Sequence, residues 1–239
     1  MKVKSVEEWR GETALLLEEL REFASVLRAE PFANREGLRG VSAFALWWYL
    51  RRLSPTLVFE VGVWRGYSTW LIEQAAPQAE IVCLDPLLAV QSKLKRASRL
   101  RHSSSRATYS AQDFSCMPVA DIVAGHERPV AFFDDHQNKL PRLLQARTAG
   151  IRDVVFDDNS RERLTHETLE QARLDPDSAA TLEALVQTYE TFPALWAVDT
   201  TIGSLRLKED GLGLPVEKVF ANVHAERDWH SYVTYVQLR

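Results

Sequence analysis

A glycine-containing segment in the first third of the chain has the residue types and spacing of a ligand-binding loop. Residues 60–68 read Glu-Val-Gly-Val-Trp-Arg-Gly-Tyr-Ser and complete a short apolar run, which predicts a strand, a turn and a helix. Gly62 and Gly66 can adopt backbone conformations closed to other residues, and they let a ligand approach the main chain. The amides at the start of the following helix would then face an anion or a carboxylate.

An acid at the end of the next apolar run favours a nucleoside-like ligand. Asp85 follows Gly62 by 23 residues, and an acid at that place in an alternating α/β fold hydrogen-bonds a ribose diol. The dinucleotide fingerprint has a middle glycine where this chain has Trp64. Because the indole would crowd a pyrophosphate, the loop argues against a nicotinamide cofactor and for a smaller ligand with a carboxylate.

Acidic residues follow two further apolar runs. Residues 134–136 read Asp-Asp-His, and residues 157–159 read Asp-Asp-Asn. Adjacent strands lie about 4.8 Å apart, so up to four carboxylates would share one pocket and repel one another unless a cation or protons intervene. Such oxygen ligands suit Mg²⁺, Mn²⁺ or Ca²⁺. Aspartates at strand ends also form caps and turns, and we prefer that role for Asp134 and Asp157 taken singly.

The glycine segment resembles motif I of the catechol O-methyltransferase-like group of class I methyltransferases. That group also has an aromatic residue in place of the middle glycine and a Gly-Tyr-Ser ending. The resemblance implies S-adenosyl-L-methionine as cofactor, with Glu60 and Ser68 at its methionine end, Asp85 at the ribose, and Gln112 and Asp113 near the adenine. The residues expected to bind the cofactor are Glu60, Gly62, Trp64, Gly66, Tyr67, Ser68, Asp85, Gln112, Asp113 and Asp134.

The same resemblance implies a metal site at the acidic strand ends. The Asp-His and Asp-Asn pairs are similar to the family's endings of its fourth and fifth strands, which bind a divalent metal that orients and acidifies a substrate hydroxyl. The metal ligands expected here are therefore Asp135, Asp158 and Asn159, with Mg²⁺ or another divalent cation bound. An alternative register would use Asp134 instead of Asp135.

The general base departs from the family's pattern. The family has a lysine shortly after Asp-His, whereas this chain has Asn138 at that position and Lys139 next. His136 has an ordinary pKa suited to a base near neutral pH. The catalytic residues expected are therefore His136 and Lys139, with the choice between them open.

The elements that must position these residues alternate between strand and helix, which predicts a doubly wound α/β fold. The fold expected is a mostly parallel, seven-stranded, Rossmann-like methyltransferase sheet with N-terminal helices and a C-terminal antiparallel hairpin. Strands are expected at residues 56–63, 80–84, 107–110, 129–133, 151–156, 216–223 and 232–238. Helices are expected at residues 5–30, 42–53, 67–75, 88–101, 139–148 and 179–189.

Length and composition fit one methyltransferase-like domain over residues 1–239. We divide it into N-terminal helices (1–54), a cofactor-binding core (55–160), a helix with a lid or substrate loop (161–215) and a hairpin (216–239). The net charge of −4 gives no reason to expect nucleic acid or an acidic membrane as partner. No apolar run reaches the roughly 20 residues of a membrane span, and the two cysteines lack metal-ligand spacing. We expect a cytoplasmic location and a homodimer.

The activity that these features favour is methyl transfer from S-adenosyl-L-methionine to a hydroxyl of a small-molecule acceptor, with a divalent metal assisting. Other metal chemistry on the same fold, as in a hydroxylase or hydrolase, is the first alternative, since a fold does not fix a function. A non-catalytic module that keeps the cofactor pocket is the second. The sequence does not identify the acceptor.

Overall fold

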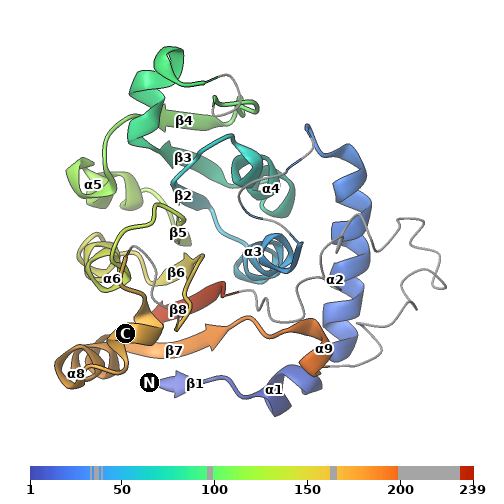
Figure 1. Ribbon diagram of the computed structural model, residues 1–239, viewed down its shortest axis with the longest axis vertical. Coiled ribbons are helices and arrows are strands. Elements are labelled where there is room, and N and C mark those ends of the chain that lie inside the picture. The colour runs from blue at the N-terminus through green and yellow to red at the C-terminus, as the bar shows by residue number, and fades with distance from the viewer. Residues whose placement is uncertain (33, 35–37, 39, 96–98, 162–165, 199–231) are drawn as a thin grey trace.

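The part of the chain that the structure describes is built on one mixed sheet of eight strands, in the order β1-β7-β8-β6-β5-β2-β3-β4 (Figure 1). The computed structural model describes the chain except residues 33, 35–37, 39, 96–98, 162–165 and 199–231. The strands are β1 (Lys2–Val3), β2 (Leu57–Val61), β3 (Glu80–Leu84), β4 (Ala107–Ser110), β5 (Pro129–Phe133), β6 (Asp153–Phe156), β7 (Val186–Thr191) and β8 (Thr234–Leu238). Only β8 is antiparallel to its neighbours β6 and β7. The doubly wound, mostly parallel α/β sheet predicted from the sequence is confirmed, with the two-residue β1 added at one edge.

The helices cover both faces of the sheet, as alternating strands and helices require. Figure 1 shows α2, α3 and α4 over one face and α5, α6 and α8 over the other. The α-helices are α1 (Val6–Gly11), α2 (Thr13–Val26), α3 (Gly40–Leu53), α4 (Tyr67–Ala75), α5 (Val119–Val123), α6 (Lys139–Thr148), α7 (Leu169–Ala172), α8 (Pro176–Leu185) and α9 (Leu195–Val198). The 3₁₀ helices are η1 (Leu27–Ala29), η2 (Pro86–Lys93) and η4 (Phe114–Cys116).

The two hydrophobic cores follow from the alternation of side chains along the strands. In β2, Val58 packs into the core beneath α3 and α4, whereas Leu57, Phe59 and Val61 pack into the core on the opposite face. All five residues of β2 are buried, as expected for a central parallel strand covered on both faces.

The pairing register brings four strand ends to one edge of the sheet. Val61 pairs with Leu84 of β3 and with Phe133 of β5, and Phe133 pairs with Phe156 of β6. The next residue after each of these strands therefore lies at about the same level. The chain runs outward from β2 in both directions, and the carboxyl ends of strands at such a switch point are where open α/β sheets bind ligands.

Several predicted elements were wrong in extent or type. The helix expected at 179–189 ends at Leu185, and β7 follows because its β-branched and aromatic residues pair with β8. The helix expected at 88–101 is replaced by η2, in which Val90 has a non-helical backbone. The helix expected at 5–30 is divided into α1, α2 and η1, with Glu12 at the first junction.

The C-terminal hairpin was predicted with a first strand at 216–223, which lies outside the described residues. Among the described strands, β8 pairs antiparallel with β6 and β7. Most of the expected lid loop also lies outside the described residues. Among the helices that the structure describes, none is both long and apolar enough to cross a membrane.

Candidate functional site

A pocket of about 670 Å³ opens at the carboxyl ends of β2, β3, β5 and β6. Its volume lies within the range of small-molecule sites, about 300–1,000 Å³. The pocket joins the two groups of residues that the sequence analysis singled out, the glycine segment and the acidic strand ends. Of the residues expected to bind cofactor or metal or to catalyse, those that line it are Gly62, Trp64, Asp85, Gln112, Asp113, Asp134, Asp135, His136 and Asp158.

Gly62 is required where the ends of β2 and β5 meet. Its φ is +94°, and a Cβ built on it would overlap the backbone carbonyl of Asp134. Any side chain here would therefore displace one of the acidic residues of the pocket. Gly66 has a φ of +84°, and a Cβ built on it would overlap the carbonyl oxygen of His102. This second glycine is therefore required by backbone packing outside the pocket.

Asp85 fixes the shape of the glycine loop. Its Oδ2 accepts hydrogen bonds from the amides of Val63 (3.0 Å) and Trp64 (2.9 Å), and its Oδ1 accepts one from the amide of Leu87 (2.8 Å). A carboxylate offers about four acceptor positions, so these three bonds leave capacity for a ligand hydroxyl. Because Asp85 also lines the pocket, one side chain can hold the loop and face a ligand.

Glu60 and Ser68 face the protein interior and do not line the pocket. The Glu60 carboxylate accepts hydrogen bonds from Ser68 Oγ (2.5 Å), Thr69 Oγ1 (2.6 Å) and Cys83 Sγ (3.1 Å). Burial raises the pKa of Glu60 from 4.5 to about 7, against the lowering effect of these donors. Tyr67, another expected cofactor residue, is also buried away from the pocket and packs against Trp70.

Backbone strain is concentrated in the pocket. Trp64, His136 and Asp158 have φ values of +48°, +55° and +51°, in the left-handed region that side chains rarely adopt. All three line the pocket, and Ser54 is the fourth such non-glycine residue in the described part of the chain. Such conformations cost roughly 1–3 kcal/mol each and cluster at functional sites, so this distribution itself points to the pocket.

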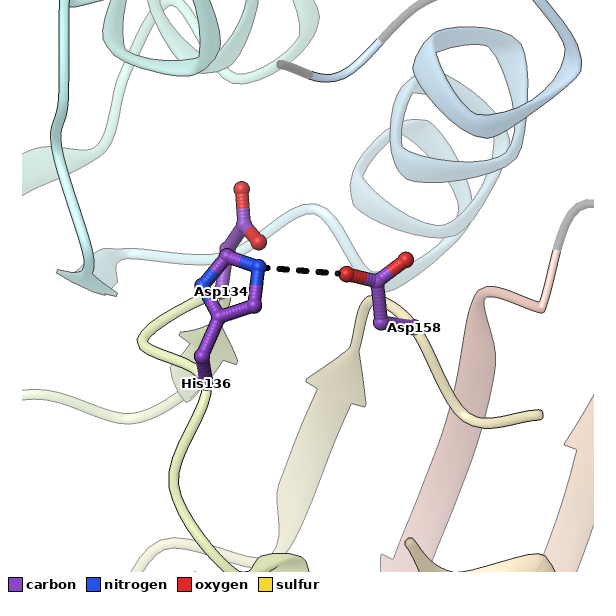
Figure 2. Close-up of side chains that lie close together, drawn as sticks. All are labelled: Asp134, His136 and Asp158. Carbon is purple, nitrogen blue, oxygen red and sulfur yellow. Dashed lines mark ion pairs between the residues drawn. The ribbon is translucent and has the colours of Figure 1, made fainter. Parts of the chain in front are cut away.

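The acidic strand ends form a compact cluster of three side chains, from Asp134, His136 and Asp158 (Figure 2). One potential ligand atom from each lies within 4.8 Å of those of the other two. His136 Nε2 is 3.3 Å from Asp158 Oδ2. The hydrogen bond to Asp158 raises the pKa of His136 and lowers the pKa of Asp158.

Two carboxylates at the strand ends, Asp134 of this cluster and the neighbouring Asp157, are poorly solvated. Burial, then the charges of Asp157 and Asp158, raise the pKa of Asp134 well above its ordinary value. Burial and the charge of Asp158 raise the pKa of Asp157 to about 7. Carboxylates in this state gain from a bound cation, because it offsets both the burial and the mutual repulsion.

Two residues expected to bind metal are engaged elsewhere. Asp135 Oδ2 accepts a hydrogen bond from Arg142 Nε (2.8 Å), and Arg142 also donates to Asp113 (Nη1–Oδ1, 3.0 Å). Asn159 Nδ2 donates to Tyr189 Oη (2.6 Å) and to Thr234 Oγ1 (2.9 Å), deep in the protein. The structure therefore brings Asp158 together with Asp134 and His136, and not with Asp135 and Asn159.

Lys139 lies at the first position of α6, close to the acidic residues but outside the pocket lining. Its side chain is buried, with Nζ 5.6 Å from the centre of the Phe156 ring. Burial lowers its pKa, while the charges of Asp157 and Asp158 act in the opposite direction. The positive charge of Lys139 therefore offsets the negative charges of the buried carboxylates, and the side chain does not face a ligand in the pocket.

Two side chains near the pocket were missed in the sequence analysis. Arg142, which binds both Asp113 and Asp135, follows Lys139 by three residues, so helical spacing could have indicated that it faces the same strand ends. His166 lies in the loop before α7, with its ring centre 5.7 Å from that of His136. No local pattern in the sequence distinguishes it.

Neither a protein-family model nor a curated protein matches this chain. The solved structures that resemble it include CmcI in its apo form, at 14% identity and a TM-score of 0.46 over 66% of this chain and 68% of that one. The plantazolicin methyltransferase BpumL, bound to SAH and a monoazolic desmethylPZN analog, matches at 11% identity and a TM-score of 0.46 over 98% of both chains. An O-methyltransferase from Bacillus cereus, in complex with SAH, matches at 12% identity and a TM-score of 0.39 over 94% of this chain and 90% of that one.

Proposed function

We propose that this chain transfers the methyl group of S-adenosyl-L-methionine to a hydroxyl of a small-molecule acceptor, with a divalent cation bound beside the acceptor. One observation carries the proposal. The glycine loop held by Asp85 and the cluster of Asp134, His136 and Asp158 open into the same pocket, which allows a cofactor and a charged reaction centre to meet. A single domain, a cytoplasmic location and a homodimer stay predictions from the sequence.

The residues around the glycine loop fit the cofactor. Gly62 lets the backbone after β2 lie against that of Asp134 at the pocket, and Trp64 and Leu87 are pocket-lining residues that present exposed apolar surface. Asp85 would accept from the ribose hydroxyls, and Gln112 lies among the lining residues where the adenine is expected. When bound, the cofactor supplies an electrophilic methyl group on sulfur. Glu60 and Ser68 would act by shaping the loop from beneath.

The cluster of Asp134, His136 and Asp158 fits a divalent cation better than the ligand set predicted from the sequence, because Asp135 and Asn159 are held by other protein groups. Two carboxylates and one imidazole within one ion's reach are ligands that divalent metals accept. When bound, the cation supplies Lewis acidity that lowers the pKa of a hydroxyl.

The acceptor hydroxyl would be oriented by this edge of the pocket. Positioning the hydroxyl oxygen in line with the methyl group provides much of the rate enhancement in such a bimolecular transfer. The proton that leaves the hydroxyl would pass to the carboxylate of Asp157, which lines the pocket and is not one of the three proposed cation ligands. A base role for Lys139 receives no support from its buried position outside the lining.

A second candidate function is metal-dependent chemistry without methyl transfer, as in a hydroxylase or hydrolase. The imidazole of His136 within the cluster favours this alternative, because imidazole ligands are common in the sites of transition metals that activate oxygen or water. Binding of S-adenosyl-L-methionine separates the two candidates, since only methyl transfer requires it.

Isothermal titration calorimetry with S-adenosyl-L-methionine and its demethylated product tests the proposal. We expect saturable binding of both ligands in the micromolar range and no binding of NADH. Leu87→Ala should weaken binding about five- to tenfold, because the leucine contacts a ligand in the pocket mouth with a side chain worth about 1 kcal/mol of burial.

Leu144→Ala is the matched control. Leu144 is 41% exposed, close to the 37% of Leu87, but it lies on α6 outside the pocket lining. The control should bind the cofactor as the wild type does. Absence of binding in the wild type, or equal weakening in both variants, would refute the proposed cofactor site.

A further inference from the structure

His166 is a buried histidine beside the acidic cluster, and its ring nitrogens have no hydrogen-bond partner among the residues that the structure describes. The residue is 6% exposed, and neither Nδ1 nor Nε2 has a hydrogen-bond partner among the described residues. A neutral imidazole carries one donor and one acceptor, and leaving both unmet inside a protein is unfavourable. A buried histidine in this state needs a partner from outside the described residues, such as a water or a bound ion.

The surroundings of His166 place it next to the proposed cation site. Its ring meets that of His136 edge-on, with centres 5.7 Å apart and planes at 83°. His136 in turn contacts Asp158. Two imidazole nitrogens bound to one ion at about 2.1 Å lie at most about 4.2 Å apart. His166 lies outside the group of three whose ligand atoms are within 4.8 Å of one another, and rings with centres 5.7 Å apart present nitrogens at the bonding separation once the His166 side chain turns toward the cluster.

The backbone around His166 is fixed on both sides of the site. The amide of Lys139 donates to the carbonyl of Glu167 (3.0 Å), which ties the start of α6 to the residue after His166. Thr168 caps α7 and donates from Oγ1 to the carbonyl of Ser160 (2.6 Å), just beyond the acidic end of β6. The two residues that follow His166 are thus tied to both segments that carry the cluster, which keeps this histidine beside it.

We propose that His136 and His166 are paired imidazole ligands which, with Asp158 and Asp134, make this a site for a first-row transition metal such as Fe²⁺, Co²⁺ or Zn²⁺ in preference to Mg²⁺. The inference rests on the cation site of the proposed function and specifies its metal. Mg²⁺ selects oxygen ligands and retains water, whereas imidazole suits the later divalent metals. Two imidazoles and a carboxylate are a donor set that transition metals bind with open positions left for a substrate.

Cobalt titration of the metal-free full-length chain tests the ligand set without any methyl transfer. Co²⁺ gives visible absorption bands when bound by protein nitrogen and oxygen, and equilibrium dialysis compares its affinity with that of Mg²⁺. We expect Co²⁺ to bind at least about tenfold more tightly than Mg²⁺. His166→Ala and His166→Asn should each weaken Co²⁺ binding by about tenfold or more, with Mg²⁺ binding changed much less.

His126→Ala is the matched control, because His126 also lies beside a carboxylate, with Nε2 3.6 Å from Glu80, on a different part of the sheet. It should leave the cobalt affinity and spectrum unchanged. Pulsed electron paramagnetic resonance of Cu²⁺ bound to the wild-type chain provides a measurement that needs no variant. Two coordinated imidazoles are expected there.

Three results would overturn the inference: fewer than two imidazoles in the copper spectrum, unchanged cobalt affinity in folded His166 variants, or Mg²⁺ bound as tightly as Co²⁺. Folding of each variant is checked by circular dichroism. These outcomes are distinct from failure of the cofactor test, since metal binding requires no S-adenosyl-L-methionine. Cobalt binding through both histidines in a chain that never binds the cofactor would support the metal site and refute methyl transfer.

Discussion

Replacing Glu60 by glutamine should make the protein more stable, relative to the wild type, as the pH rises, although Glu60 accepts three side-chain hydrogen bonds. The carboxyl group is fully buried beneath the glycine loop, and burial raises its pKa from 4.5 to about 7. Below pH 4.5 Glu60 carries a proton in both the folded and the unfolded chain. Between pH 4.5 and 7 the unfolded chain releases that proton while the folded chain keeps it, so stability falls as the pH rises and levels off above 7.

The size of the effect follows from the shift in pKa. A rise from 4.5 to about 7 corresponds to about 3 kcal/mol at roughly 1.4 kcal/mol per pH unit, of which about 2.5 kcal/mol falls between pH 5 and pH 8. Glutamine does not titrate, and the hydroxyls of Ser68 and Thr69 can rotate to accept from its amide. Any constant cost of the altered hydrogen bonds is the same at both pH values.

Urea denaturation at pH 5 and pH 8 measures this difference directly. The stability of Glu60→Gln relative to the wild type should increase by about 2.5 kcal/mol from pH 5 to pH 8. Glu18→Gln, on the exposed face of α2, is the control and should follow the wild type. A relative change below about 0.5 kcal/mol, or one of opposite sign, would show that Glu60 ionises normally in the folded protein and that our account of the buried loop is wrong.

Two further substitutions separate packing from ligand binding at the strand ends. Gly62→Ala should destabilise the fold by about 1–3 kcal/mol in urea denaturation, because its φ is +94° and the new Cβ meets backbone; Gly125→Ala, with no atom within 4 Å of its Cβ, should cost less than about 0.5 kcal/mol. Asn159→Ala should cost about 1–3 kcal/mol, since it leaves the buried amide of Leu169 unpaired, yet leave cobalt binding intact. Asp158→Asn should weaken cobalt binding and change the stability little. Loss of cobalt binding in a folded Asn159→Ala variant would show that Asn159 is a metal ligand.

The strands that carry the site could be predicted from the sequence alone. The runs at 80–84, 107–110 and 129–133 coincide with β3, β4 and β5, because short apolar runs between turn-forming residues leave little choice of element. The boundary between α8 and β7 was missed because Val186 continues the apolar pattern of the helix. What ends the helix is pairing with β8, nearly 50 residues later in the chain, and no local pattern contains that information.

The sequence located the segments that form the candidate site, but it did not show which side chain in each segment belongs to the site. Asp134 and Asp135 are adjacent acids, and only their partners distinguish them, since Arg142 occupies the second and leaves the first beside His136 and Asp158. A resemblance in sequence aligns the segments and does not contain this choice. The place of His166 beside the cluster could be predicted even less. It depends on a tertiary contact, the hydrogen bond from the amide of Lys139 at the start of α6 to the carbonyl of Glu167.

The strained positions explain why adjacent acids differ in role. A strand that continued straight would send successive side chains to opposite faces of the sheet. His136 and Asp158 instead adopt left-handed backbone conformations immediately beyond β5 and β6, which turn both side chains toward one point above the strand ends. Trp64 also adopts a left-handed backbone conformation beyond β2, and its amide donates a hydrogen bond to Asp85. Three unfavourable conformations around one pocket are accounted for if the directions of these side chains serve a shared ligand.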